Sequence, residues 1–164
     1  MEKSTYLTFV LGKEYFAVCV DEVLEVLQHQ QITSVPKTPD HILGIINFRG
    51  DILPVVDTRI KFNLSTQDEN QRSIIIVFDI AGEDQRIQIA ATADAVKDVI
   101  EVDPDEIKPV PEMGISYNAK FISGAIRRND TFIMMLNIEK VFSISDLAMV
   151  QQLTDTTNIL ETTN

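Results

Sequence analysis

The apolar positions of this chain fall into short runs that are rich in β-branched residues and separated by polar turn residues. Such runs are typical of β-strands, because β-branched and aromatic side chains pack well on a pleated, half-buried surface. The first two runs, residues 6–11 and 15–20, flank Gly12 and Lys13 and predict a hairpin. The chain is therefore expected to be mainly β.

A second predicted hairpin is the most informative stretch, with strands at 45–48 and 52–56 around a turn at 49–51. Gly50 can take a positive φ angle, which places the arginine of this turn at the hairpin tip. Pro54 cannot donate a backbone hydrogen bond, so its strand is predicted to lie at a sheet edge or to carry a bulge. An edge strand with an arginine at its tip is suited to binding another protein.

The segments between and after the hairpins carry other signals. Asp21 stands in an N-cap position before residues 22–27, which predict a short helix or turn. Residues 32–35 predict a short strand, and residues 36–40 predict a proline-rich turn. The polar residues 63–72 predict a surface linker.

From residue 74 onward the pattern begins again, which indicates an internal duplication. Residues 74–80 and 86–91 predict a hairpin, and the acidic start at 94–100 echoes the one at Asp21. Three pairs of matching residues have the same spacing, since 124 − 44, 137 − 57 and 142 − 62 all give 80: Gly44 and Gly124, Asp57 and Asn137, and Phe62 and Phe142. Two unrelated hairpins can also look alike, but the shared order of elements favours a true repeat.

Each half has about five short strands, which predicts two small closed β-barrels packed through a shared apolar interface. The expected ranges are 6–66 and 72–142 within one domain that covers residues 1–142. The pattern leaves room for an exchange of strands between the barrels. Residues 143–164 are expected to form a C-terminal helix or tail.

Composition favours a cytosolic protein, and its length favours one globular unit or two small subdomains with a shared core. A chain of 164 residues buries roughly 70% of its unfolded surface on folding, so it needs neither a metal nor a disulfide to fold. Cys19 is the single cysteine, which suits a reducing compartment. The sequence shows no signal peptide and no apolar run that approaches the roughly 18 residues of a membrane span.

The net charge of −11 argues against nucleic acid and anionic lipid as partners. Signals for catalysis are weak: His29 and His41 have no nearby cysteine, and Cys19 sits in an apolar run, where it is expected to be buried and inert. Residues 103–106 form an acidic cluster that lacks the spacing of a calcium loop and predicts a solvated turn. No catalytic residue, metal site or cofactor is therefore predicted.

One set of motifs carries a family resemblance, and its residues are Ile32-Thr33-Ser34-Val35-Pro36, Pro39, Gly44-Ile45-Ile46-Asn47-Phe48-Arg49-Gly50 and Pro54-Val55-Val56-Asp57. This pattern resembles the signature of the CheW chemotaxis coupling protein family. The likeness runs from about Tyr6 to Phe142. The sequence departs from the family at Thr58 and Phe48, where leucine is usual.

The resemblance implies two SH3-like five-stranded barrels and a non-catalytic adaptor. Members of this family bridge the cytoplasmic tips of chemoreceptors to the regulatory domain of the histidine kinase CheA. The implied location is the cytoplasm, at receptor arrays on the inner face of the membrane.

The resemblance also implies two sets of contact residues. The receptor-binding residues would be Arg49, Val23, Glu25, Asn47 and Gly50. Three simpler explanations stay open: the arginine could pair internally with Asp51 or Asp57, the valine could pack in the core, and a kinase-contact glycine could serve the backbone alone.

That glycine belongs to the second set, since the kinase-binding residues would be Ile32 and Gly44. The repeat of glycine at position 124 supports a backbone requirement at position 44. An alternative function from another class is a small barrel that binds a ligand or nucleic acid. The acidic charge and the lack of an aromatic stacking surface argue against nucleic acid.

Overall fold

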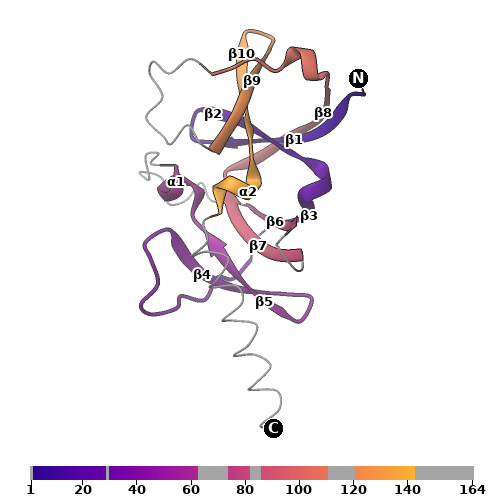
Figure 1. Ribbon diagram of the computed structural model, residues 1–164. Helices are drawn as coiled ribbons and strands as arrows, with labels where there is room; N and C mark the ends of the chain where they lie inside the picture. Colours follow the sequence, from indigo (N-terminus) through magenta and orange to yellow (C-terminus); the bar gives the residue numbers. More distant parts are fainter. Residues whose placement is uncertain (1, 29, 63–73, 82–85, 111–120, 143–164) are drawn as a thin grey trace.

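The computed structural model describes residues 2–28, 30–62, 74–81, 86–110 and 121–142 (Figure 1). The expected linker at 63–72 and the expected C-terminal helix or tail at 143–164 lie outside these residues. The described part consists mainly of strands in two five-stranded sheets, with short helices between them. The prediction of a mainly β fold with two five-stranded, SH3-like units is confirmed.

The first sheet, called barrel A, has the strand order β8-β1-β2-β10-β9. Its strands are β1 (Ser4–Leu11), β2 (Glu14–Cys19), β8 (Ala95–Val102), β9 (Ile122–Arg128) and β10 (Thr131–Leu136). All neighbours are antiparallel except β2 and β10, which run parallel. Barrel A forms the upper half of the molecule in Figure 1.

The second sheet, called barrel B, has the order β3-β6-β7-β5-β4. Its strands are β3 (Val23–Gln28), β4 (Ile42–Phe48), β5 (Asp51–Val56), β6 (Ile74–Ala81) and β7 (Arg86–Ala93). Here β5 and β7 form the parallel pair. Each sheet thus contains one parallel pair, as expected for two copies of one unit.

In the described residues, each sheet is closed by one isolated bridge between two residues. In barrel B, Thr33 exchanges both backbone hydrogen bonds with Ile45 of β4, at 2.9 and 2.8 Å. In barrel A, Lys108 does the same with Ala125 of β9, at 2.9 and 2.8 Å. Because the bridging segment follows the strand at the far end of the sheet, each bridge brings the two ends of its sheet together.

The sheets do not follow the two halves of the sequence. Barrel A combines β1 and β2 with three strands from the end of the chain, while barrel B takes β3 to β7. The expected ranges 6–66 and 72–142 are therefore interleaved through the exchange of strands that the sequence allowed. The chain crosses between the barrels at the 3-10 helix η1 (Val20–Glu22) and at Asp94 between β7 and β8.

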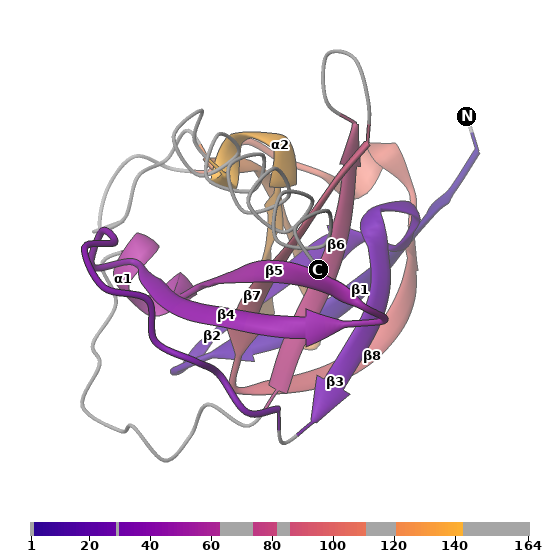
Figure 2. The ribbon, with the colours of Figure 1, turned by 90° about the horizontal axis from the view of Figure 1, so that it is seen from below.

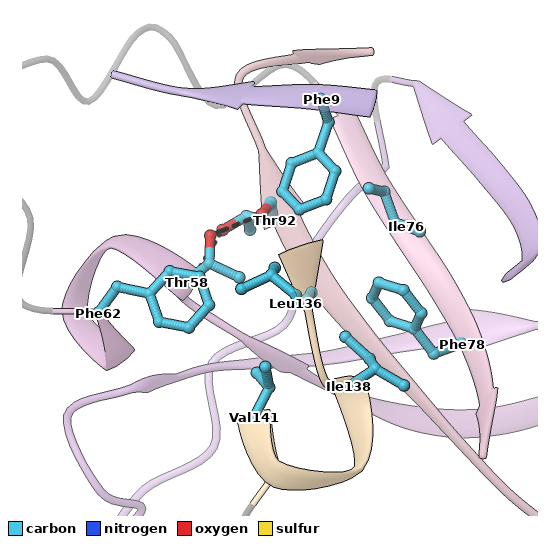
Figure 3. Close-up of a pocket in the computed structure, with 10 residues that line it drawn as sticks. Phe9, Thr58, Phe62, Ile76, Phe78, Thr92, Leu136, Ile138 and Val141 are labelled. Atoms are coloured by element: carbon cyan, nitrogen blue, oxygen red, sulfur yellow. Dashed lines mark hydrogen bonds between the residues drawn. The ribbon is translucent and has the colours of Figure 1, made fainter. Parts of the chain in front are cut away.

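One apolar cluster joins both barrels and forms a shared core. Its largest buried members include Phe16 and Leu11 from barrel A and Phe78 and Ile89 from barrel B. A cavity of about 10 Å³ lies at this junction. Figure 3 shows the side chains that line it, among them Phe9, Ile76 and Leu136. A volume of this size holds about one water molecule, so the two barrels are packed closely against one another.

Thr58, one of the two positions where the sequence departs from the expected family pattern, lies beside this cavity and is buried. Its hydroxyl donates a hydrogen bond of 2.7 Å to the carbonyl oxygen of Thr92, as drawn in Figure 3. A buried hydroxyl is tolerated when it is hydrogen-bonded, so the substitution leaves the core intact.

Two sequence predictions for short elements are wrong. Residues 23–28 form strand β3 instead of a helix or turn, and residues 95–102 likewise form a strand. The preceding Asp21 lies inside η1, whose N-cap is Cys19 and has no side-chain cap. The reason is tertiary: β3 pairs with the apolar residues 74–78 of β6, and such pairing outweighs a local capping signal.

The predicted strand at 32–35 is reduced to the single bridge at Thr33. The prediction that the strand of Pro54 is an edge strand is also wrong, because β5 lies between β7 and β4, and the register shift of this hairpin lies between Ile42 and Gly44 instead of at Pro54. Pro54 stands opposite Ile45, whose backbone groups bond to Thr33 on the other side. The proline nitrogen therefore faces away from β4, and pairing with β7 begins only at Val55.

The matched residues of the duplication occupy equivalent places. Asp57 and Asn137 are the N-caps of the short helices α1 (Thr58–Lys61) and α2 (Ile138–Val141). Their backbone N–H groups donate to the carbonyl oxygens of His41 and Phe121, at 2.7 and 2.8 Å. These acceptors are again 80 residues apart, since 121 − 41 gives 80, so the repeat predicted from the sequence is present in the fold.

Candidate protein-binding surface

The β4–β5 hairpin ends in a turn formed by Arg49 and Gly50, with φ angles of 53° and 89°. Two positive φ angles are typical of the type I′ turn, whose twist matches that of the flanking strands. The backbone N–H of Gly50 donates to Oδ1 of Asn47 at 3.0 Å, which fixes the turn. The hairpin, whose two strands run across the view in Figure 2, therefore presents its arginine at an ordered tip.

The Arg49 side chain is 66% exposed and lies over the ring of Phe48, 4.8 Å from its centroid. Its Nη2 atom is 3.4 Å from Oε2 of Glu25, a side chain that is 40% exposed. An ion pair this open contributes little to stability, because water screens it and both side chains lose freedom. The guanidinium is therefore accessible to a carboxylate or carbonyl oxygen of a partner.

The internal pairing considered for Arg49 takes a different form from the one expected. The carboxylate paired with it belongs to Glu25 of β3, not to Asp51 or Asp57. The Asp57 carboxylate instead caps α1, accepting from the backbone N–H of Arg59 at 3.0 Å. The structure thus brings together four of the residues assigned to receptor binding, namely Arg49, Gly50, Asn47 and Glu25.

Val23, the fifth of these residues, stands at the start of the same strand as Glu25. Its side chain is half-buried and packs against the shared core. Core packing therefore describes part of its role, and the rest of its side chain is open to solvent.

Gly44 and Ile32, assigned to kinase binding, are neighbours across the bridge that closes barrel B. An ideal Cβ atom on Gly44 would lie 2.2 Å from the carbonyl oxygen of Thr33 and 3.0 Å from Cγ2 of Ile32. Gly44 itself is buried, whereas Ile32 is half-buried against a small apolar cluster under β4. The absence of a side chain at Gly44 is thus required by the close approach of the backbone. At this place the residue that reaches the surface is Ile32 of the bridging segment.

The β9–β10 hairpin carries a second tip that the sequence analysis did not single out. Its turn residues Asn129 and Asp130 have φ angles of 51° and 63°, so both tips share one geometry. Phe132 is 63% exposed, and the Arg127 guanidinium lies 6.0 Å from its ring centroid. The repeat could have located this tip, since 129 − 49 and 130 − 50 both give 80.

An open groove of about 450 Å³ lies where the two barrels meet, lined by residues that include Tyr6, Cys19, Glu22, Arg86 and Glu139. Burial, and then the nearby Glu139 carboxylate, raise the pKa of Glu22. Burial, followed by the charges of neighbouring groups, also raises the pKa of Tyr6. These shifts share one cause, because a charged group is poorly solvated at this junction.

Cys19 lies at the edge of this groove and is partly exposed, so the expectation of full burial is wrong. Burial of the thiol nevertheless raises its pKa. A raised pKa keeps the thiol protonated at neutral pH, and the protonated form is a poor nucleophile.

The acidic cluster at 103–106 has a structural role. Asp103 caps the 3-10 helix η3 (Pro104–Glu106) by accepting from the backbone N–H of Asp105 at 3.0 Å. Glu106 returns the bond by accepting from the N–H of Asp103, and it also pairs with Arg128 at 3.1 Å. In the described ranges, no group of three or more His, Cys, Asp or Glu side chains is placed to hold a metal ion.

The described helices include none that is long and apolar enough to span a bilayer. Four features of the described surface are candidate binding sites for a partner: the two hairpin tips, the bridging segment at Ile32 and the groove between the barrels.

Comparison with known proteins identifies the family. The model of the CheW-like domain matches residues 5–146. The chain is 29% identical over 145 residues to the chemotaxis protein CheW of Klebsiella aerogenes, covering 88% of this chain and 85% of that protein. It is 30% identical over 137 residues to the chemotaxis protein CheW of Helicobacter pylori, covering 83% of this chain and 79% of that one.

A solved structure agrees with this result. The scaffolding protein TtCheW from Thermoanaerobacter tengcongensis superposes with a TM-score of 0.76 at 29% sequence identity, covering 88% of this chain and 96% of that one. The resemblance drawn from the motif around Arg49 is thereby confirmed, and the chain belongs to the CheW-like family.

Proposed function

We propose that this protein is a chemotaxis scaffolding protein that joins chemoreceptors to the histidine kinase CheA. The relatives named above are chemotaxis and scaffolding proteins, which supports a coupling role without catalysis of its own. In this proposal the protein works in the cytoplasm and is recruited to receptor arrays at the inner face of the membrane. Its partners are the receptor cytoplasmic tip and the kinase regulatory domain.

The observation that carries the proposal is the ordered, exposed Arg49 at the tip of β4–β5. The turn geometry holds the guanidinium outside the barrel, and Glu25 binds it only loosely at 3.4 Å. Arginine is enriched at interface hot spots because its planar group forms paired hydrogen bonds with carboxylates. We assign Arg49, Glu25, Asn47, Gly50 and the exposed part of Val23 to the receptor-binding surface.

We assign the kinase contact near Gly44 to the bridging segment that begins at Ile32. The close approach of Thr33 to Gly44 supports an indirect role for the glycine, which lets the segment lie flat on β4. A receptor surface and a kinase surface on one small protein would allow it to hold both partners together.

A small barrel that binds nucleic acid is the competing function. The net charge of −11 and the absence of a row of exposed aromatic residues in the described strands speak against it. An electrophoretic shift with single-stranded DNA or RNA at physiological salt would overturn the scaffolding proposal in its favour.

The first test measures calorimetric binding of the wild type and of Arg49→Glu to a receptor-tip fragment and to the kinase regulatory domain. We expect the substitution to weaken receptor binding by about tenfold or more, since a hot-spot arginine contributes at least about 1.4 kcal/mol. Kinase binding should stay unchanged. The melting temperature should also stay nearly unchanged, because the lost pair with Glu25 is exposed and worth less than about 1 kcal/mol.

The control for this test is a charge swap. Glu25→Arg combined with Arg49→Glu rebuilds the internal pair with its charges exchanged, but it presents the wrong charge to a partner. Receptor binding should therefore remain weak in the double variant. Full recovery of binding in the double variant would show that Arg49 serves only the internal pair, and would contradict its assignment to the interface.

A further inference from the structure

We propose that Phe48 is a positioning residue for receptor binding, because its buried ring holds the guanidinium of Arg49 in the place where a receptor meets it. Phe48 itself touches no partner in this proposal. The inference rests on the proposed function, which assigns Arg49 to the receptor-binding surface. It adds a residue that none of the assigned contacts includes.

The ring of Phe48 is a rigid support. Phe48 is 4% exposed and packs in an apolar cluster of barrel B with Leu53, Val55 and Val77. Side chains in a close-packed core sit in defined rotamers, so the ring has a fixed place. The Cζ atom of Arg49 lies 4.8 Å from the ring centroid, a distance at which a cation is attracted to an aromatic face. The ring can therefore restrain one side of an otherwise exposed guanidinium.

The turn brings the arginine over this ring. Consecutive residues of a strand point to opposite faces of the sheet, so Arg49 in an extended strand would point away from Phe48. With a φ angle of 53°, Arg49 is left-handed and ends this alternation. The hydrogen bond from the N–H of Gly50 to Oδ1 of Asn47 holds the turn in that form. The backbone thus sets the direction of the arginine, and the ring receives it.

The ion pair with Glu25 is too open to hold the arginine by itself. Its length is 3.4 Å, and the two side chains are 66% and 40% exposed, so water screens the attraction. In the described part of the chain, the Nε and Nη1 groups of Arg49 donate to no protein acceptor. The ring therefore restrains the guanidinium and leaves these N–H groups available to the receptor. A side chain that is ordered before binding loses less conformational freedom on binding.

The duplication provides a comparison within the chain. Positions 128 and 129 match positions 48 and 49, since 128 − 48 and 129 − 49 both give 80. They hold Arg128 and Asn129, and both residues of that turn also have positive φ angles. The Arg128 side chain is 36% exposed and pairs with Glu106 at 3.1 Å. A tip of the same kind thus forms beside a polar residue, so the hairpin alone does not explain the ring of Phe48.

The test compares Phe48→Leu with the wild type in the full chain. Leucine keeps an apolar side chain in the core and removes the ring. Calorimetry measures binding to a receptor-tip fragment, and denaturant unfolding measures stability. The matched control is Phe78→Leu, which makes the same change at a buried phenylalanine of barrel B that packs in the shared core instead of the cluster around Phe48.

We expect Phe48→Leu to weaken receptor binding by about threefold to tenfold, because the arginine then has more freedom to lose on binding. Phe78→Leu should bind the receptor as the wild type does. In proton NMR spectra of the free protein, the side-chain resonances of Arg49 should shift in Phe48→Leu, since the ring current of the phenylalanine is gone. The same resonances should stay in place in Phe78→Leu.

A double-mutant cycle separates positioning from a general disturbance of the barrel. If the ring acts through the guanidinium, Phe48→Leu weakens receptor binding only while Arg49 is present, so its effect disappears in an Arg49→Ala background. An equal loss in both backgrounds would overturn the inference, because it would assign the effect to packing alone. Unchanged receptor affinity in Phe48→Leu would overturn it as well.

The outcomes also distinguish this inference from the proposed function. If Arg49→Ala bound the receptor as tightly as the wild type does, the proposed receptor-binding surface would fail, and the role of Phe48 with it. If Arg49→Ala lost affinity while Phe48→Leu kept it, only the positioning role would be refuted.

Discussion

Gly44 and Gly124 lie where the bridging segment of each barrel approaches the strand with which it pairs. At Gly44 an added Cβ would lie 2.2 Å from a backbone oxygen of Thr33, and backbone atoms cannot move aside without breaking the bridge to Ile45. At Gly124 the nearest atom would be Cγ2 of Ile107 at 2.5 Å, with the Lys108 carbonyl oxygen at 3.0 Å. A side chain can rotate away, so the two sites should tolerate a methyl group differently.

Gly44→Ala should therefore destabilise the protein by about 1–3 kcal/mol, the usual range for overpacking, and Gly124→Ala by less. Denaturant unfolding measures the free energies. Hydrogen exchange should show that the amides of Thr33 and Ile45 lose protection in Gly44→Ala. The control is Gly50→Ala, which has open space around its Cβ and carries only the strain of its positive φ angle, about 1–2 kcal/mol. Unchanged protection at Thr33 would refute the role given to Gly44.

At the scale of elements, a buried ion pair links α1 to the junction between β7 and β8. Arg59 and Asp94 pair through the guanidinium, with side chains only 5% and 11% exposed. Asp94 also accepts from the backbone N–H of Gly12 in the β1–β2 turn at 2.6 Å, and its own N–H donates to Val10. One carboxylate thus connects the helix of barrel B to a turn of barrel A at a point where the chain crosses between them.

Asp94→Asn should cost about 3–5 kcal/mol, because it breaks a buried ion pair by removing the charge of one partner while the Arg59 charge stays buried. Denaturant unfolding measures the loss. The double variant Arg59→Met with Asp94→Asn should regain part of it, since both charges of the pair are then removed together. If the single and double variants lost equal stability, the ion pair would not be the cause.

At the scale of the whole molecule, the junction between the barrels shapes the titration of the protein. The pKa of Glu22 is raised by burial and by Glu139, so the folded form holds its proton to higher pH than the unfolded chain does. Its contribution to stability is therefore fully present below the ordinary glutamate pKa and is lost as the pH rises through the raised value. Above that value the charged carboxylate works against folding.

Glu22→Gln should therefore raise the melting temperature at neutral pH. The gain should shrink as the pH falls through the raised pKa and should vanish below about 4.3, where wild-type Glu22 is protonated in both states. Thermal melts across this range give the comparison. Glu14→Gln in β2 is the control, because it makes the same change at an exposed side chain that is not among the groups raising the pKa of Glu22. A constant difference at every pH would exclude titration of Glu22 as the cause.

Particular residues show where prediction from the sequence succeeded. The turn at Gly50 depends on local chemistry, because a positive φ angle favours a few residue types. The constant spacing of 80 residues between matched positions such as Gly44 and Gly124 correctly predicted the duplication. The family itself followed from the motif around Arg49, whereas the role of these residues in receptor binding stays a prediction.

Other residues show where local patterns could not decide. Asp21 has the chemistry of a helix cap, yet the residues after it form β3 because β6 provides a partner strand. Pro54 is typical of an edge strand, yet it lies inside the sheet because its nitrogen faces a gap in the pairing. Phe132 looks like any strand residue in the sequence, and only the fold shows that its side chain is exposed.

The sequence by itself determined the mainly β character, the two repeated units and the family, since these depend on residue preferences and on order along the chain. The tertiary structure decided which strands share a sheet, that Glu25 meets Arg49, and that Asp94 joins the two barrels. These facts depend on contacts between residues far apart in the chain. Such contacts form wherever burial and hydrogen bonding are best satisfied for the whole molecule, which no local pattern records.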